Sequence, residues 1–114
     1  MARKVTIYHN PKCTTSCNVL AMIEASGAKP EVVEYLKAGW TRSQLKQLFA
    51  DAGLTAREAM RKKAAEDLGI SEKATDAKIL DAMVEHPVLV ERPFVVSAKG
   101  TRLARPKEKV REVL

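Results

Sequence analysis

The most chemically reactive side chains of the sequence are two cysteines four residues apart, Cys13 and Cys17. Cys13 follows the turn-forming segment His9-Asn-Pro-Lys12, which itself follows the strand-like run Lys4–Tyr8. A helical pattern begins near Cys13, so this cysteine is predicted at a strand-to-helix junction, where backbone N–H groups point outward. Such N–H groups lower the pKa of a thiol and can also bind an oxyanion. We therefore predict that Cys13 is an ionised nucleophile at neutral pH.

The helix that carries both cysteines is expected to begin near Cys13 or Thr14, to run to about Ser26 and to end at Gly27, a natural C-terminal cap. At helical spacing, Cys13 and Cys17 fall on one face, away from the apolar stripe of the helix. A bridge between them would close a very short loop and add little stability. A close pair of this kind in a reducing compartment is more often catalytic or redox-active than structural.

The remaining elements predict a small α/β fold with a mixed four-stranded sheet flanked by helices. A second strand is expected at Glu31–Leu36, parallel to the first because a helix connects them. Phe94–Ser97 and Arg102–Ala104 predict a hairpin. Pro106 suits the first turn of a last helix. Three further helices are predicted between the second and third strands, over residues 41–52, 55–68 and 76–85.

The length of 114 residues is that of one domain. We expect sheet-forming parts at about residues 1–36 and 88–114, with a helical insertion at about 41–86. The apolar runs are far shorter than the ~20 residues of a membrane span, so no membrane partner is expected. The first residues, Met1-Ala-Arg-Lys4, lead into a strand rather than the apolar region of a signal peptide, which predicts a cytoplasmic protein.

The net charge is +6, from 20 Lys and Arg against 14 Asp and Glu, and both ends of the chain are basic. This distribution could form an anion site or a weak nucleic-acid face. The sequence argues against nucleic-acid binding, because it lacks a long basic run and aromatic residues make up only 4% of it. No metal site is expected, since His9, Cys13 and Cys17 match none of the common structural zinc spacings.

Six segments spread over nearly the whole chain carry a more specific signal. They are Ile7-Tyr-His-Asn-Pro11 leading to Cys13, Ala59-Met-Arg-Lys62, Leu68-Gly69, His86-Pro87, Glu91-Arg-Pro-Phe-Val-Val96 and Gly100-Thr-Arg-Leu-Ala-Arg-Pro106. In order and rough spacing they resemble the glutaredoxin-coupled arsenate reductases and their close relatives. The resemblance implies a thioredoxin-like fold with a helical insertion, and it assigns Pro93 to the cis-proline of such folds.

The resemblance also implies roles for individual side chains. In the family, the cysteine matching Cys13 attacks arsenate, and the histidine matching His9 influences its ionisation. Arginines matching Arg61, Arg92 and Arg105 bind the oxyanion, a task that suits the planar, permanently charged guanidinium. Glutathione is then expected as co-substrate and glutaredoxin as recycling partner, with no bound cofactor.

The chain departs from the family at position 17, where family members usually carry an arginine and this chain has Cys17. The change removes a cation and supplies a second thiol one helical turn from Cys13. Helical Cα atoms at this spacing lie about 6 Å apart, within reach of a disulfide, although roughly parallel Cα–Cβ bonds would demand strain or local unwinding. Cys17 is either a resolving cysteine or a tolerated replacement.

Other functions remain open at this point. Spx-type regulators share the fold, bind RNA polymerase and sense oxidation through a cysteine pair, but that pair is two residues apart. A thiol-disulfide oxidoreductase that uses Cys13 and Cys17 on another substrate is a further alternative. Phosphatase-like arsenate reductases and low-molecular-weight phosphatases fit poorly, because they need an arginine where this chain has Val19.

Overall fold

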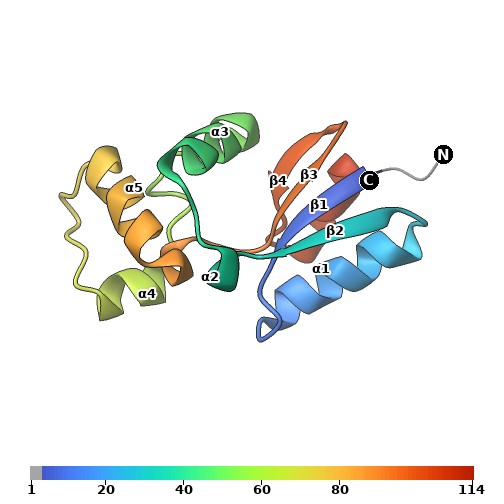
Figure 1. Cartoon of the computed structure of the whole chain (residues 1–114), viewed down its shortest axis with the longest axis horizontal. Coiled ribbons are helices and arrows are strands. Elements are labelled where there is room, and N and C mark those ends of the chain that lie inside the picture. Colours follow the sequence, from blue (N-terminus) through green and yellow to red (C-terminus); the bar gives the residue numbers. More distant parts are fainter. Residues whose placement is uncertain (1–3) are drawn as a thin grey trace. The chain divides into compact units, whose positions relative to one another are not determined.

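The computed structural model describes residues 4–114 and divides the chain into two compact units. Unit 1 comprises the described chain up to Ala38 together with Arg92–Leu114, and unit 2 comprises Gly39–Glu91. Unit 1 contains the sheet and unit 2 is helical (Figure 1). Within the described residues, no helix is both long and apolar enough to cross a bilayer.

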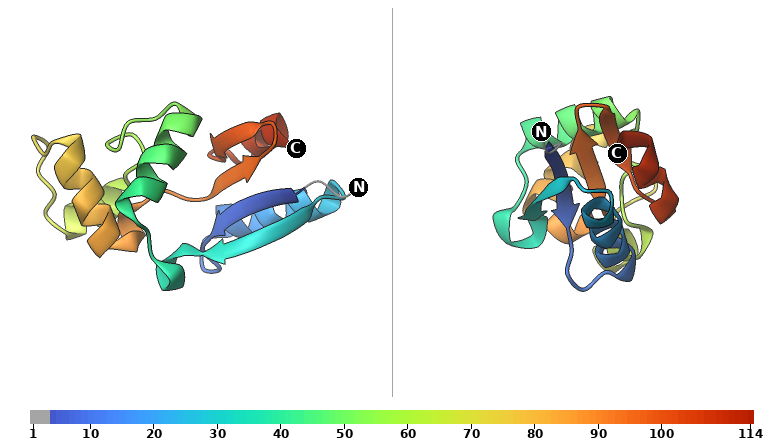
Figure 2. Two further views of the ribbon diagram at one scale, coloured as in Figure 1. Left: turned by 45° about the horizontal axis from the view of Figure 1, so that its top comes forward. Right: turned by 90° about the vertical axis from the view of Figure 1, so that its right-hand side faces the viewer.

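The sheet of unit 1 has four strands in the order β2-β1-β3-β4. The central strand β1 (Lys4–His9) pairs in parallel with β2 (Lys29–Glu34), and the two run side by side in Figure 2. On its other side β1 pairs antiparallel with β3 (Phe94–Ser97), which forms a hairpin with β4 (Gly100–Leu103). The structure therefore confirms the predicted mixed four-stranded sheet and the parallel pairing of its first two strands.

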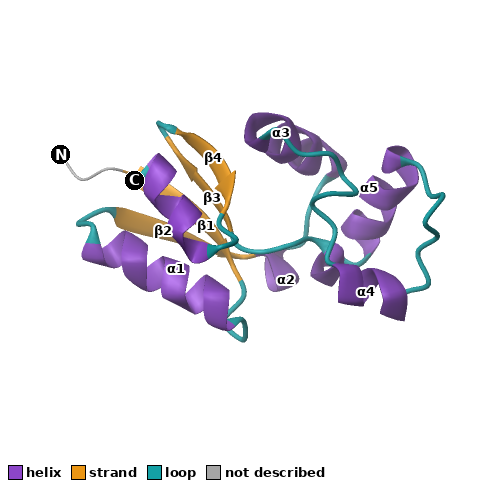
Figure 3. Ribbon diagram, turned by 180° about the vertical axis from the view of Figure 1, so that it is seen from behind, coloured by secondary structure: helices purple, strands orange, loops and turns teal. Residues whose placement is uncertain are grey.

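Two helices of unit 1 pack together on one face of this sheet. They are α1 (Thr14–Ala25) and the 3-10 helix η2 (Lys107–Val113), which lie on the same side of the strands in Figure 3. Alternate residues of β1 face them, since side chains alternate between the two faces of a strand. The resulting core consists of Val5, Ile7, Val19, Ile23, Val95, Ala104, Val110 and Val113. This packing fixes α1 against β1 and so places the beginning of α1 beside the end of the central strand.

Unit 2 contains three α-helices, α3 (Arg42–Ala52), α4 (Lys62–Asp67) and α5 (Asp76–Glu85), followed by the 3-10 helix η1 (Pro87–Leu89). The predicted capping box at the start of α3 is present, because the Thr41 and Gln44 side chains each accept the other's backbone N–H. Helices α3 and α5 contact each other and are joined by an ion pair between Arg42 and Asp81.

The second strand was expected at Glu31–Leu36, but β2 ends at Glu34 and is followed by the short helix α2 (Tyr35–Ala38). The reason lies in the register of the sheet. Glu34 pairs with His9, the last residue of β1, so β1 offers no further partner to continue the ladder. In the hairpin, β4 begins at Gly100 instead of Arg102 because the turn between the strands is shorter than expected.

Two helix predictions were also wrong, one in the extent of the helix and the other in its type. The predicted helix at 55–68 is reduced to α4, although Thr55 and Glu58 exchange the expected capping hydrogen bonds. Its path is interrupted because the Arg61 backbone N–H donates to the Leu89 carbonyl at 2.8 Å, which holds Arg61 in an extended conformation. The last helix is a 3-10 helix, with Pro106 just before it rather than inside its first turn.

The core of unit 1 predicts the effect of shortening a buried side chain of α1. Ile23 is fully buried, so Ile23→Ala should lower the free energy of unfolding by about 2–5 kcal/mol, through lost burial and the cavity left behind. Urea denaturation followed by circular dichroism measures this. The matched control is Glu24→Ala at the next, exposed position of the helix. Equal stability of the two variants would contradict this description of the core.

Candidate active site

Cys13 occupies the N-cap position of α1, immediately before the first helical residue. Asn10 stabilises the turn that precedes Cys13. Its side-chain oxygen accepts the Lys12 N–H at 3.0 Å, and its carbonyl oxygen accepts the Cys13 N–H at 3.0 Å. The backbone of Cys13 is extended, with φ −97° and ψ 119°, while its carbonyl accepts the first helical hydrogen bond, from Cys17, at 3.0 Å. The thiol is therefore set at the N-terminal end of the helix rather than along its side.

This position controls the ionisation of Cys13, whose side chain is only 8% exposed. Burial by itself raises the pKa of the thiol. Hydrogen bonds from the backbone N–H groups of Ser16 and Thr15, together with the charge and a hydrogen bond of Arg92, act in the opposite direction. The combined result is a pKa below the usual value for cysteine, which favours the nucleophilic thiolate.

Arg92 and Arg105 lie together in unit 1. The Arg105 guanidinium donates to the Arg92 carbonyl oxygen at 3.2 Å, and each arginine precedes a cis peptide bond, to Pro93 and to Pro106 respectively. Arg105 also lines a shallow cavity of about 250 Å³ that opens beside Thr15, in the first turn of α1. Two guanidinium groups and outward-facing helix N–H groups can bind a small tetrahedral oxyanion beside the Cys13 sulfur.

Behind the nucleophile, His9 and Ser16 form a buried pair, 7% and 0% exposed respectively. His9 Nδ1 lies 2.6 Å from the Ser16 hydroxyl, which also accepts the Asn10 N–H at 3.1 Å. Burial lowers the pKa of His9, and the carboxylate of Glu34 offsets part of that shift. A neutral His9 can accept the Ser16 hydroxyl proton at Nδ1, which leaves the Ser16 oxygen free to accept from Asn10. His9 thus acts on the Ser16 side chain, and the Ser16 N–H in turn faces Cys13.

Ser16 is a site residue that the sequence reasoning missed. Its position three residues after a helix N-cap, in a segment rich in Thr and Ser, resembles ordinary helix-start composition. The available signal was the short distance along the chain to His9, which ends the preceding strand. Only packing of α1 on β1 turns that proximity into a hydrogen bond.

The remaining predicted site residues lie in different surroundings. Cys17 is an exposed, free cysteine whose thiol donates to the Pro11 carbonyl oxygen at 3.3 Å. Arg61 belongs to unit 2, where it precedes α4 and lines a cavity of about 230 Å³ together with Leu68 and Val88. Nowhere in residues 4–114 do three or more His, Cys, Asp or Glu side chains gather as metal ligands.

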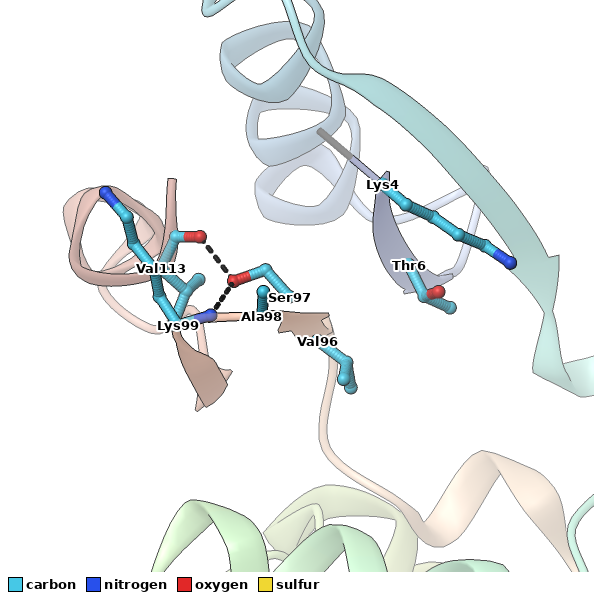
Figure 4. A pocket seen from close by; sticks show the side chains of 7 residues that line it. All are labelled: Lys4, Thr6, Val96, Ser97, Ala98, Lys99 and Val113. Atoms are coloured by element: carbon cyan, nitrogen blue, oxygen red, sulfur yellow. Dashed lines mark hydrogen bonds between the residues drawn. The ribbon is translucent and has the colours of Figure 1, made fainter. Parts of the chain in front are cut away.

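A larger cavity, of about 500 Å³, lies beside the start of β1 (Figure 4). Cys13, by contrast, follows the end of that strand. The cavity is lined by Lys4 at the start of β1 and by the turn of the β3–β4 hairpin. Its two lysines already have partners, since Lys4 pairs with Glu31 at 3.3 Å and Lys99 donates to the Leu114 carbonyl at 2.6 Å. We therefore assign the candidate active site to Cys13 and its neighbours rather than to this larger cavity.

The electrostatics of the site predict the effect of removing the Arg92 charge. Arg92→Gln should raise the pKa of Cys13, because a cation that stabilises the thiolate is lost while burial remains. The pH midpoint for alkylation of Cys13 by iodoacetamide should then move upward, and the rate at neutral pH should fall. Arg111→Gln, at an exposed position of η2, is the control. An unchanged midpoint in Arg92→Gln would contradict the assigned role.

The buried hydroxyl of Ser16 leads to a stability prediction. Ser16→Ala leaves the Asn10 N–H and His9 Nδ1 without this partner, which should cost about 1–3 kcal/mol of unfolding free energy. Thr14→Ala, at an exposed position of the same helix, should cost less, and the comparison can be made by urea denaturation. If Ser16→Ala were no more destabilising than Thr14→Ala, the buried network would contribute nothing to stability.

Comparison with known proteins identifies relatives that match nearly the whole chain in sequence and in fold. A sequence model of the ArsC family matches residues 8–113. The chain is 56% identical over 113 residues to the arsenate reductase ArsI2 of Synechocystis, covering 96% of this chain and 81% of the relative. It is 48% identical to an arsenate reductase of Escherichia coli, with 96% and 80% covered. Among solved structures, an arsenate reductase from Vibrio cholerae superimposes with a TM-score of 0.93 at 40% identity, over 100% of both chains.

The agreement extends from sequence to fold, and it confirms the resemblance that the six segments indicated. It also confirms the expected thioredoxin-like α/β fold, with a mixed four-stranded sheet flanked by helices. The family match begins at Tyr8, one residue before the end of β1, and ends at Val113 in η2, so it includes Cys13, Arg92 and Arg105. The chain belongs to the ArsC family.

Proposed function

We propose that the chain reduces arsenate to arsenite through a covalent adduct on Cys13. The observation that carries this proposal is a nearly buried thiol at the N-cap of α1, where the helix N–H groups and Arg92 lower its pKa. Relatives that share about half of its residues are named arsenate reductases, which gives the oxyanion its proposed identity.

In the first step, arsenate is held by the side chains of Arg92 and Arg105, beside the N-terminal end of α1. The hydrogen bond of the Arg105 guanidinium to the Arg92 carbonyl keeps the two arginines together, and Arg105 lines the same cavity as Thr15 of α1. The positive groups offset the repulsion between the arsenate anion and the Cys13 thiolate, which otherwise disfavours their approach. The family resemblance adds Arg61 to the proposed oxyanion ligands.

Attack by the Cys13 sulfur on arsenic forms a sulfur–arsenic bond and releases one arsenate oxygen as water. We infer that glutathione supplies the second thiol. Its sulfur bonds to the Cys13 sulfur, the sulfur–arsenic bond breaks, and the electron pair of that bond remains on arsenic as arsenite. Each sulfur is oxidised by one electron, and arsenic is reduced by two. Glutaredoxin then returns the mixed disulfide to free Cys13 by thiol–disulfide exchange.

The proposed cycle requires a reduced Cys13 at the start of every turnover, and it uses no bound cofactor. A compartment that maintains glutathione in its reduced form meets that requirement. We therefore propose that the protein works in the cytoplasm.

The proposal is tested by arsenite production from arsenate with glutathione and glutaredoxin. Cys13→Ser should abolish the activity, because a serine hydroxyl is not ionised at neutral pH. Arg105→Gln should lower kcat/KM by roughly 10²-fold, as for loss of a charged group that stabilises an oxyanion. Arg61→Gln tests the role that the resemblance assigns to Arg61.

Arg111→Gln serves as the control for nonspecific loss of positive charge, since Arg111 is exposed on η2. Retained arsenite production by Cys13→Ser would overturn the proposal. So would an intact chain that is inactive while its Cys13 thiol is shown to be reduced.

A further inference from the structure

We propose that Cys17 is an internal resolving cysteine, which expels arsenite from the Cys13 adduct by forming a Cys13–Cys17 disulfide. This inference rests on the proposed function and changes its second step. The chain itself would supply the thiol that otherwise comes from glutathione, and an external thiol would be needed only afterwards.

The N-cap position of Cys13 removes the obstacle that a regular helix would impose. Two cysteines inside a helix at this spacing have nearly parallel Cα–Cβ bonds, which hinders a disulfide. Cys13, however, has an extended backbone, and its sulfur accepts the N–H groups of Thr15 and Ser16. The Cys13 sulfur therefore lies across the end of α1 instead of along its side.

The thiol of Cys17 points toward this same end of the helix. Helical side chains lean toward the N-terminus of their helix. In agreement, the Cys17 sulfur lies 3.3 Å from the carbonyl oxygen of Pro11, two residues before Cys13. The Cys17 N–H donates to the Cys13 carbonyl at 3.0 Å, so their Cα atoms are separated by about one helical turn, within the usual range for a disulfide.

The exposure of the two thiols gives them different access to each other and to solvent. Cys13 is 8% exposed, so an external thiol must enter a confined site to reach its sulfur, whereas Cys17 is exposed and already attached to the same helical turn. Attachment makes the second attack intramolecular, which raises the effective concentration of the attacking thiol. To attack, Cys17 must release its hydrogen bond to Pro11 and lose its proton.

The environment also sets the order of the two thiols. The N–H groups and the Arg92 cation that favour a thiolate act on Cys13, which therefore attacks arsenate first. Cys17 then loses its proton and attacks the Cys13 sulfur. The sulfur–sulfur bond forms as the sulfur–arsenic bond breaks. The electron pair of the sulfur–arsenic bond remains on arsenic, which becomes trivalent.

The atoms and electrons of the cycle balance. Two thiols lose two electrons as they form one disulfide, and arsenic gains these two electrons. One arsenate oxygen and the two thiol protons leave as water. A low-molecular-weight thiol such as glutathione, or a dithiol protein, then reduces the Cys13–Cys17 disulfide for the next turnover.

A single-turnover experiment without any external thiol tests the inference. The chain is fully reduced, freed of reductant under anaerobic conditions and mixed with arsenate. We expect about one arsenite per chain, and a monomer that has lost two hydrogens by mass spectrometry, with Cys13 and Cys17 joined in one peptide. Non-reducing electrophoresis separates this product from disulfide-linked dimers.

Cys17→Ser is the informative variant, because a serine hydroxyl can still donate to the Pro11 carbonyl while the second sulfur is removed. It should form no arsenite in the absence of thiol, and added glutathione should restore arsenite release. Asn18→Ser, at the next exposed position of α1, is the matched control and should behave like the intact chain in the single turnover.

The outcomes separate this inference from the function on which it rests. An intact chain that forms arsenite only when glutathione is present would overturn the resolving role of Cys17 and leave the reductase proposal standing. Equal single-turnover yields from Cys17→Ser and the intact chain would also overturn it. No arsenite under either condition would contradict the proposed function itself.

Discussion

The site depends on a conflict between burial and charge at one sulfur atom. Burial of Cys13 favours its neutral thiol, which is a poor nucleophile, whereas a thiolate in a low-dielectric site needs compensating groups. The fold provides these by placing Cys13 at the N-cap of α1, where the Thr15 and Ser16 N–H groups have no partner within the helix. Arg92 adds a full positive charge. Without these groups, burial alone would raise the pKa of Cys13 and leave the thiol protonated and poorly nucleophilic.

The sheet of unit 1 brings these groups together from distant parts of the sequence. β1 leads directly to Cys13, and its partner β3 follows directly after Arg92 and Pro93. Arg105 follows β4, and its guanidinium donates a hydrogen bond to the backbone carbonyl of Arg92. The antiparallel pairing of β3 with β1 is therefore what sets an arginine beside the nucleophile. The core beneath the sheet maintains this arrangement.

Local signals in the sequence were sufficient for much of this description. Turn residues before Cys13 predicted the strand-to-helix junction, the Thr41 and Gln44 pair predicted a helix start, and the α5 range was predicted at Asp76–Glu85, as observed. The errors have non-local causes. The end of β2 depends on where β1 ends, and the break before α4 depends on the Arg61 N–H pairing with Leu89, 28 positions along the sequence. No local pattern contains that information.

The candidate site shows the same division. Cys13, Arg92 and Arg105 were predicted from residue type and family resemblance, while the bond between His9 and Ser16 requires helix packing on the strand. The direction of the Cys17 thiol could not be predicted either, since it depends on the extended backbone of Cys13 and on the path of the Pro11 loop. Sequence spacing gave the two cysteines a common helix face. The structure instead gives them a common helix end.

The most direct test of this account is a titration of Cys13 itself. In the Cys17→Ser variant, Cys13 is the sole cysteine, and the chemical shift of its labelled β-carbon reports ionisation by NMR. The account predicts a midpoint clearly below the ~8.5 of a free cysteine. A midpoint at or above that value would mean that burial outweighs the helix N–H groups and Arg92, and would contradict the central claim.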